Sequence, residues 1–200
     1  MILLNRNAEQ IFWLGRYLNR IEYLCDQFPF QNNAQALKYA HAFCLPAFDA
    51  ESLNALLQDP EQPASFNQQF QSSKNNIQDL RGVLSAHAYA ELHQLIKNAH
   101  ENLAYIGEVA VECHEILEAE AEDIFLFFSL GQNIEQLDRQ MRLKQQQAQT
   151  LKNLDHTIDL LNQMGWNKLN HAWHQLKLSP DSIHLYHFHD HMQTVFEVDV

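Results

Sequence analysis

Hydrophobic residues recur every three to four positions along most of this chain, which is the spacing that places them on one face of an α-helix. The clearest stripe lies near the amino terminus and consists of Ile11, Leu14, Leu18, Ile21 and Cys25. The 200 residues include only 5 Gly and 5 Pro, so there are few turn residues for a fold of many short strands. The pattern predicts an all-α fold, a helical bundle.

Prolines divide the first third of the chain, and helices tend to end before a proline. Helices are expected there at residues 5–27, 32–45 and 50–58. Asp49 is expected to cap the third of them, and residues 59–63, which hold two prolines, are expected to form a loop.

The stretch between Pro63 and Pro180 has no internal proline and is expected to hold successive helices. Breaks between these helices are expected near residues 81–85, 106–107, 118–123 and 164–165. Ser85 is expected to cap the helix that follows it, and the Gln-rich residues 145–149 are interpreted as a solvated helical surface.

From Ser179 onward the composition shifts to aromatic, β-branched and His residues. This favours a short strand or an irregular arm, so the chain is divided into a helical bundle at residues 1–178 and a His-rich C-terminal arm at residues 179–200. In a strand, alternate residues share one face and could ligate a divalent metal such as zinc or nickel. The candidate ligands are His187, His189 and His191. The alternative is a solvated tail, or one that contacts another subunit.

A second copy of the first helix is visible 116 residues further on, where FSLGQNIEQLD at Phe128–Asp138 aligns with FWLGRYLNRIE at Phe12–Glu22. The hydrophobic stripe is kept, and Gly15 aligns with Gly131. A glycine inside a helix costs about 1 kcal/mol relative to alanine, so its recurrence indicates a close contact between helices. Two repeat-related core helices are therefore expected.

The opposite face of the first helix carries Trp13, Arg16 and Arg20, and its arginines are replaced by glutamines in the second copy. Two interpretations of the arginines remain open. They could clamp a carboxylate or a phosphate with their guanidinium forks. Alternatively, they form an internal ion-pair network that ties the two helices together. The acids available for such a network are Glu9, Glu22 and Glu135.

Three segments of the chain resemble motifs that occur together, in this order, in one protein family. Arg6–Leu24, RNAEQIFWLGRYLNRIEYL, is close to R-x-A-E-x-x-x-W-x-G-R-Y-x-E-R-x-E. Asn75–Ser85 is similar to E-N-A-R-x-V-R-x-x-L-S, and Phe128–Asp138 is similar to L-G-R-Y-x-E-R-A-D. These are the opening, internal and second elements of the bacterial alpha-E domain family, which the chain therefore resembles.

The resemblance is incomplete at the charged positions. The family's Glu-Arg pair reads Asn19-Arg20 in the first copy and Glu135-Gln136 in the second. In the middle motif, Asn75 and Gln78 replace an acid and a base. The chain is also shorter than the usual member, so it resembles a divergent, short alpha-E protein.

The family context implies a role rather than a reaction. Alpha-E proteins tend to be encoded beside ATP-grasp proteins and transglutaminase-like peptidases, which implies a system that modifies peptide or amide bonds. The expectation is a non-catalytic accessory or scaffold protein that binds a partner protein or a peptide. Its interface is expected to include Trp13, Arg16, Arg20, Asn76, Arg81 and Glu135.

Two other functions remain open. One is a metal-binding protein or an enzyme that uses the C-terminal histidines, and a divalent metal there is the single cofactor to consider. The other is a homo-oligomer in which the C-terminal arm is exchanged between subunits. No nucleophile elbow, P-loop, dinucleotide fingerprint or HExxH motif occurs, so the residues give no support for an enzyme.

Charge and composition narrow the remaining classes. The formal net charge of −12 at pH 7 disfavours a nucleic-acid partner. The cysteines at 25, 44 and 113 are odd in number and form no CxxC pair, which favours a reducing cytoplasm over a disulfide framework. No apolar run approaches about 18 residues and no basic segment precedes one, so neither a membrane span nor a signal peptide is expected.

Overall fold

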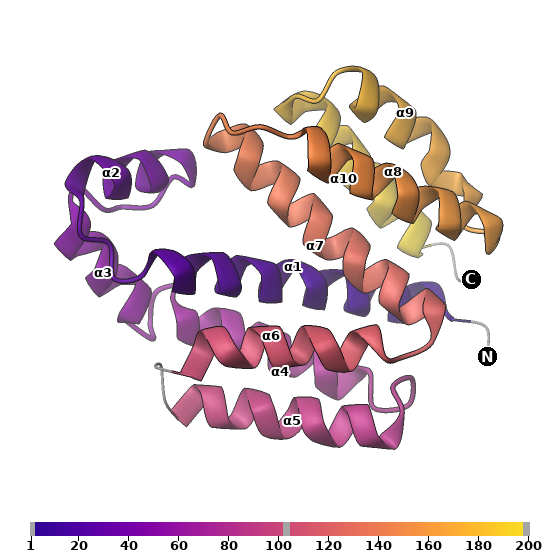
Figure 1. Cartoon of the computed structure of the whole chain (residues 1–200), viewed down its shortest axis with the longest axis horizontal. Coiled ribbons are helices and arrows are strands. Elements are labelled where there is room, and N and C mark those ends of the chain that lie inside the picture. Colours follow the sequence, from indigo (N-terminus) through magenta and orange to yellow (C-terminus); the bar gives the residue numbers. More distant parts are fainter. Residues whose placement is uncertain (1–2, 102–104, 198–200) are drawn as a thin grey trace.

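The computed structural model describes residues 3–101 and 105–197, and every regular element within these ranges is a helix (Figure 1). The helices are α1 (Asn5–Gln27), α2 (Asn33–Ala42), α3 (Ala50–Gln58), α4 (Phe66–Asp79), α5 (Ala86–Glu101), α6 (Ile106–Glu118), α7 (Glu122–Arg142), α8 (Ala148–Gln163), the 3-10 helix η2 (Asn167–Leu169), α9 (Asn170–Leu178) and α10 (Ser182–Glu197). The expected all-α fold is confirmed. None of the described helices is long and apolar enough to cross a membrane.

Short polar side chains begin several of these helices, because their oxygens accept hydrogen bonds from the first free backbone N–H groups. Asp49 accepts from the backbone of Ser52, and the hydroxyl of Ser52 accepts from the backbone of Asp49, which makes a capping box at α3. Asn32, Ser65 and Ser85 cap α2, α4 and α5. The predicted caps at Asp49 and Ser85 are confirmed.

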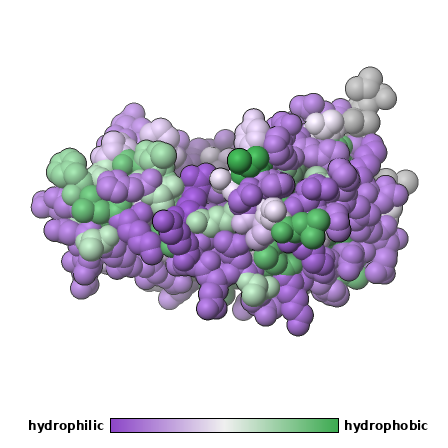
Figure 2. All heavy atoms as spheres, turned by 90° about the horizontal axis from the view of Figure 1, so that it is seen from above, coloured by the Kyte–Doolittle hydropathy of each residue, from purple (hydrophilic) through white to green (hydrophobic). Residues whose placement is uncertain are grey.

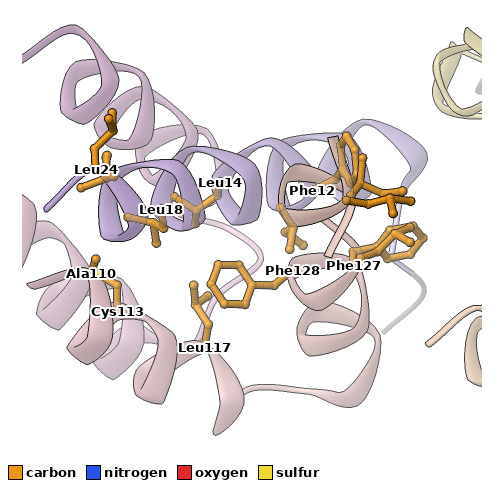
Figure 3. Close-up of a cluster of buried hydrophobic side chains, with 14 of the residues drawn as sticks. Phe12, Leu14, Leu18, Leu24, Ala110, Cys113, Leu117, Phe127 and Phe128 are labelled. Carbon is orange, nitrogen blue, oxygen red and sulfur yellow. The ribbon is translucent and has the colours of Figure 1, made fainter. Parts of the chain in front are cut away.

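Helix α1 lies at the centre of the bundle and contacts α4, α6, α7 and α10 (Figure 1). The stripes predicted for α1 and α7 form the core. At most 1% of the surface is exposed at Ile11, Leu14, Leu18, Ile21, Phe127, Leu130, Ile134 and Leu137. Figure 3 shows Ala110, Cys113 and Leu117 of α6 turned toward α1, with Phe128 of α7 reaching into the same cluster. This central packing fixes how α1 and α7 meet.

Helices α1 and α7 cross at two glycines. A Cβ atom on Gly15 would overlap the carbonyl oxygen of Phe128, and a Cβ atom on Gly131 would overlap the carbonyl oxygen of Phe12. Phe12 aligns with Phe128 in the predicted repeat, so the contact is reciprocal. Only glycine lets the two backbones approach this closely. The close contact is confirmed, whereas an origin of the two helices by duplication stays a prediction.

The C-terminal segment is not a strand or an irregular arm, and that expectation is wrong. It forms α10, which packs against α1, α7 and α9 of its own chain. Its buried side chains recur at helical spacing: Leu185, Phe188, Met192, Val195 and Phe196. Asp181 starts the helix by accepting from the backbone of His184. Residues 198–200 lie outside the described residues, and the boundary at residue 178 stays a prediction.

Two helix ends also differ from expectation. Lys144 has a left-handed φ of 56°, so α7 ends before the Gln-rich run and residues 143–147 form the turn to α8. Cys44 has a left-handed φ of 54°, which stops α2 short of residue 45. The breaks expected at residues 81–85 and 164–165 fall between helices, and the break expected around 118–123 lies at residues 119–121, whereas residues 106–107 begin α6.

Candidate functional site

A groove of about 1040 Å³ lies over the crossing of α1 and α7, between α2 and α3 on one side and the start of α10 on the other. The base of the groove is formed by Trp13, Arg16, Arg20, Leu24, Ile134, Asp138, Met141 and Arg142. Its walls are largely apolar or aromatic and include Tyr39, Phe43, Leu45, Leu57, Pro63, Leu185 and Tyr186. Figure 2 shows hydrophobic surface at the α2 end and again toward the C-terminal helices, with mainly hydrophilic residues between them.

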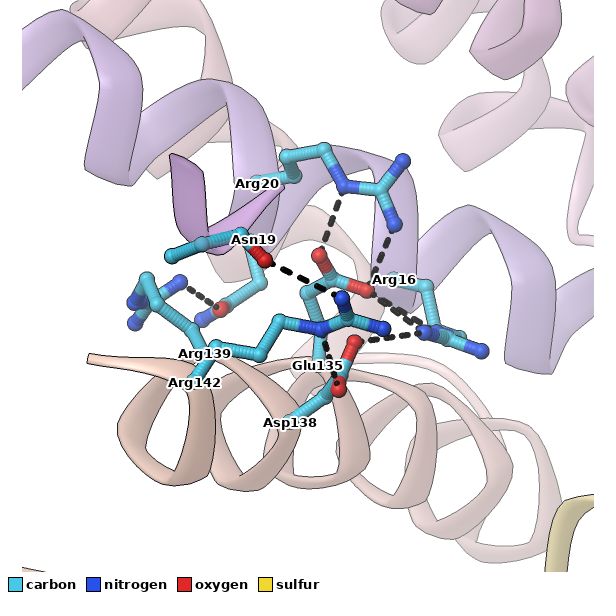
Figure 4. A network of polar contacts seen from close by, with 8 residues as sticks. Arg16, Asn19, Arg20, Glu135, Asp138, Arg139 and Arg142 are labelled. Carbon is cyan, nitrogen blue, oxygen red and sulfur yellow. Dashed lines mark hydrogen bonds and ion pairs between the residues drawn. The ribbon is translucent and has the colours of Figure 1, made fainter. Parts of the chain in front are cut away.

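At the base, Glu135 of α7 accepts hydrogen bonds from two arginines of α1. Arg20 Nε donates to Oε1 at 2.6 Å, and Arg20 Nη2 donates to Oε2 at 2.8 Å. Nε and Nη2 of Arg16 are both 2.9 Å from Oε2 (Figure 4). Glu135 is 1% exposed, and a buried carboxylate requires such partners because an unpaired one is strongly destabilising. The structure thus contains the ion-pair network that was one of the two interpretations of these arginines.

The charge state of this network is fixed. Burial by itself raises the pKa of Glu135, but the charges and hydrogen bonds of Arg20 and Arg16 outweigh burial and lower the pKa below its ordinary value. Burial lowers the pKa of Arg20, yet Glu135 more than offsets it and raises that pKa. Glu135 therefore stays ionised near neutral pH and acts as a fixed anion rather than as a proton acceptor.

Asp138 and Arg142 extend the network along α7. Arg142 Nε donates to Asp138 Oδ1 at 2.8 Å, and Arg142 Nη1 donates to the backbone carbonyl of Ala42 at 3.1 Å, which ties α7 to the end of α2. The other carboxylate oxygen of Asp138 lies 3.9 Å from Arg16 Nη2. The carboxylate of Asp138 thus links the two arginines at the base.

In the aligned segments, Asn19 corresponds to Glu135 and Gln136 to Arg20, so a second Glu-Arg contact is absent there and Arg139 bonds Asn19 instead. Asn19 of α1 aligns with Glu135, and the residue beside Glu135 is the uncharged Gln136. Arg139 Nη1 donates to Asn19 Oδ1 at 3.0 Å, while its guanidinium stands 4.1 Å from the centre of the Tyr23 ring (Figure 4). Asn19 is therefore bound by an arginine that lies four positions along α7 from Glu135.

We call Arg16, Arg20, Arg139 and Arg142 the arginine cluster. These are four of the six arginines in the chain, and the carboxylates bonded within the network are Glu135 and Asp138. Four positive charges stand against the two bonded carboxylates and the nearby Glu22, which acts on Arg139, in a chain whose formal net charge is −12. The arginine cluster is a local exception to the acidic character of the protein.

His189 of α10 closes one side of the groove base. Its ring lies 5.4 Å from the ring of Trp13 in an edge-to-face arrangement. Burial lowers the pKa of His189, and Arg16 lowers it further, while Asp138 and Asp190 act in the opposite direction. The ring is therefore neutral at pH 7 and packs α10 onto α1 as an aromatic side chain.

Four of the six predicted interface residues meet here: Trp13, Arg16, Arg20 and Glu135. The other two do not line the groove. Asn76 of α4 donates to the side chain of Gln10 at 2.6 Å. Arg81 is exposed, with its guanidinium 5.9 Å from the centre of the Tyr89 ring. Membership of the middle motif therefore did not predict whether these residues line the groove.

The three histidines expected to ligate a metal are not brought together. Because α10 is a helix, His187 is exposed, His189 packs against Trp13, and His191 Nε2 lies 2.8 Å from the backbone carbonyl of Lys168. In the part of the chain that the structure describes, no three His, Cys, Asp or Glu side chains are arranged to hold a metal ion. The metal site was expected because alternate residues of a strand share one face, and in the helix α10 they do not.

Sequence reasoning missed Asp138, Arg139 and Arg142. A signal was present, because these residues follow Glu135 by three, four and seven positions and so share one face of α7. The bond between Arg142 and Asp138 is local, but the other partners of Arg139 and Arg142 lie far away in sequence, on α1 and at the end of α2, and no local pattern predicts those contacts.

Fold and site together define a helical-bundle protein whose central helices are joined by a buried glutamate–arginine network. A family model named Alpha-E, described as an alpha-helical domain with a conserved ER motif, matches residues 3–194. The chain belongs to the Alpha-E family. No curated protein and no solved structure matches it. The resemblance found in the sequence motifs is confirmed.

Proposed function

We propose that this Alpha-E protein is a non-catalytic binding component that holds a partner protein or a peptide in its groove, within a system that makes or breaks peptide or amide bonds. The observation that carries the proposal is the groove of about 1040 Å³, with largely apolar walls over a charged base. Binding sites in proteins are typically concave and mostly apolar, with a few positioned polar groups that fix orientation.

The ionisable groups of the groove support binding rather than catalysis. Glu135 is held ionised by Arg16 and Arg20. Burial raises the pKa of Tyr39 on the groove wall well above its ordinary value, so this phenol stays protonated. General acids and bases work best with pKa values near the working pH. Groups with fixed charge states are better suited to position a ligand.

The proposed partners are the ATP-grasp and transglutaminase-like proteins that accompany Alpha-E proteins. Proteins that form or cleave amide bonds need a peptide held in a defined place, and a rigid helical base with an apolar groove supplies one. The acidic surface of the chain, with its formal net charge of −12, supports a protein or peptide partner over a nucleic acid.

The proposal is tested with an ATP-grasp protein and a transglutaminase-like protein of the kind encoded beside Alpha-E proteins. Each is purified, mixed with the chain and followed by isothermal titration calorimetry. We expect at least one to bind, and we expect Tyr186→Glu to weaken that binding at least tenfold, because Tyr186 lines the groove and is 69% exposed. Val111→Glu, at an exposed apolar residue outside the groove, is the matched control. No binding by either protein, or equal binding by both variants, contradicts the proposal.

Self-association is a second candidate, favoured by apolar side chains exposed at the α9–α10 turn. Leu178 and Ile183 are 67% and 65% exposed there. Exchange of a C-terminal arm is not proposed, because α10 packs on its own chain. Light scattering of the free protein measures its mass, and Ile183→Glu should reduce that mass to a monomer's if the α9–α10 turn is a subunit contact.

A further inference from the structure

The base of the groove holds arginine N–H groups that the chain itself does not use. A guanidinium has five N–H donors. Arg20 donates from Nε and Nη2 to Glu135. Arg142 donates from Nε to Asp138 and from Nη1 to the carbonyl of Ala42. Within the described residues, Nη1 of Arg20 and Nη2 of Arg142 have no hydrogen-bond partner. Both side chains line the groove, and they are 31% and 44% exposed.

The charge of the base favours an anionic ligand. Three members of the arginine cluster, Arg16, Arg20 and Arg142, line the groove, against the two lining carboxylates of Asp138 and Asp181. Asp181 also lines the groove, but its carboxylate accepts from the backbone N–H groups of Ile183 and His184 and from the His184 ring. Glu135 is already saturated by two guanidinium groups. A further carboxylate entering the groove therefore meets N–H donors of Arg20 and Arg142 that no group of the chain occupies.

We propose that the groove binds a peptide through a free carboxylate, which Arg20 and Arg142 hold while the apolar walls hold the neighbouring side chains. This inference rests on the proposed function and names the chemistry of its ligand. The two oxygens of a carboxylate match the planar N–H pairs of guanidinium groups. Phe43, Leu45 and Tyr186 in the walls present partly or fully exposed apolar surface, which favours a peptide over a lone inorganic anion.

The carboxylate has two sources, the C-terminus of a peptide and an acidic side chain within it. The probes that separate them are three N-acetylated tripeptides: Leu-Ala-Leu with a free α-carboxyl group, the amide of Leu-Ala-Glu, and the amide of Leu-Ala-Gln as the uncharged control. Inorganic phosphate is the fourth probe. Each is titrated into the full chain by calorimetry. We expect one or both carboxylate peptides to bind at least tenfold more tightly than the Gln control, since a charged hydrogen-bonded pair contributes about that factor.

The variant that tests the contact is Arg142→Gln, because Arg142 is partly exposed and its loss leaves the buried Arg20–Glu135 pair in place. It should weaken the carboxylate peptide about tenfold, to the level of the Gln control. Arg81→Gln removes an exposed arginine outside the groove and should change nothing. Thermal unfolding of both variants verifies that they are folded.

Several outcomes overturn the inference. They are binding of both carboxylate peptides no tighter than that of the Gln amide, no effect of Arg142→Gln, tighter binding of phosphate than of any peptide, and no binding of any probe. If the ATP-grasp or transglutaminase-like protein binds the groove while the peptides do not discriminate by charge, this inference falls and the proposed function stands. If those proteins also fail to bind, both fall.

Discussion

Arg20 of α1 and Glu135 of α7 stand 115 positions apart in the chain and are joined by two hydrogen bonds, of 2.6 and 2.8 Å. The arginine comes from the first motif copy and the glutamate from the second. The Glu-Arg pair is thus formed between two helices rather than within one. The substitutions that reduce the motif, at Asn19 and Gln136, fall on positions that do not enter this pair.

Replacing Glu135 should be strongly destabilising. Glu135→Gln removes the negative charge that two arginines share at a buried site, and we expect a loss of about 3–5 kcal/mol in the free energy of unfolding. Urea denaturation measures it. Lys177→Gln breaks the exposed ion pair with Asp155 and should cost at most about 1 kcal/mol. A cost for Glu135→Gln as small as that of the control would show that the buried network does not hold the helices together.

Adding one methyl group at the helix crossing should also be costly. Gly15→Ala and Gly131→Ala each place a Cβ atom against a backbone carbonyl oxygen of the other helix, so each should lower the unfolding free energy by about 1–3 kcal/mol. Gly82→Ala is the control, because a Cβ atom there meets nothing within 4 Å, and its effect should stay within about 0.5 kcal/mol. Thermal melts of the three variants decide the matter, and similar midpoints for all of them would contradict the close crossing.

The packing of α10 should weaken as the pH falls. Burial and then Arg16 lower the pKa of His189 in the folded protein below its ordinary value of 6.5, so the unfolded chain binds the proton more readily. The stabilisation is complete above the ordinary pKa and is lost as the pH falls toward the lowered one. His189→Phe keeps an aromatic ring against Trp13 and should remove this part of the pH dependence.

The measurement for His189 is the urea midpoint at pH 8 and at pH 5.5. His187→Phe, at an exposed position on the same helix, should keep the wild-type dependence on pH. If His189→Phe loses as much stability on acidification as the wild-type protein does, groups other than His189 carry the effect.

The three cysteines should react in a defined order. Cys44 is exposed, whereas Cys113 is fully buried and its burial raises the pKa to about 12. Burial, followed by the nearby Asp26 and Glu22, raises the pKa of Cys25 to about 12 as well. Iodoacetamide followed by peptide mass spectrometry should find Cys44 modified first and Cys113 modified only after unfolding. Early labelling of Cys113 would contradict its place in the core.

The core of this fold follows from local sequence pattern, because burial and helical spacing are local properties. The stripe of α1, its counterpart on α7 and the paired glycines were all predicted and confirmed. The wrong expectation of a strand or arm at the C-terminal segment also comes from a local pattern. Its aromatic and β-branched composition was given more weight than the helical spacing of Leu185, Phe188 and Met192, which are buried on one face of α10.

Local sequence pattern predicts only part of the groove. Trp13, Arg16, Arg20 and Glu135 were predicted, since the first three share one helix face and the aligned copy pointed to the fourth. The walls come from α2, α3 and α10, whose positions depend on how the whole chain packs. Asn76 and Arg81 are expected at the interface from a motif alone, and they lie outside the groove.

The distance along the chain between the two crossing helices governs when the protein can fold during its synthesis. Helix α1 leaves the ribosome well before α7, because the helix that covers its glycine and its arginines ends only at Arg142. Before α7 is synthesised, the hydrophobic stripe of α1 has no α7 to pack against, and contacts between remote segments form late. Closure of the bundle therefore waits for the synthesis of α7, and the apolar face of α1 is exposed to aggregation in the interval before α7 emerges.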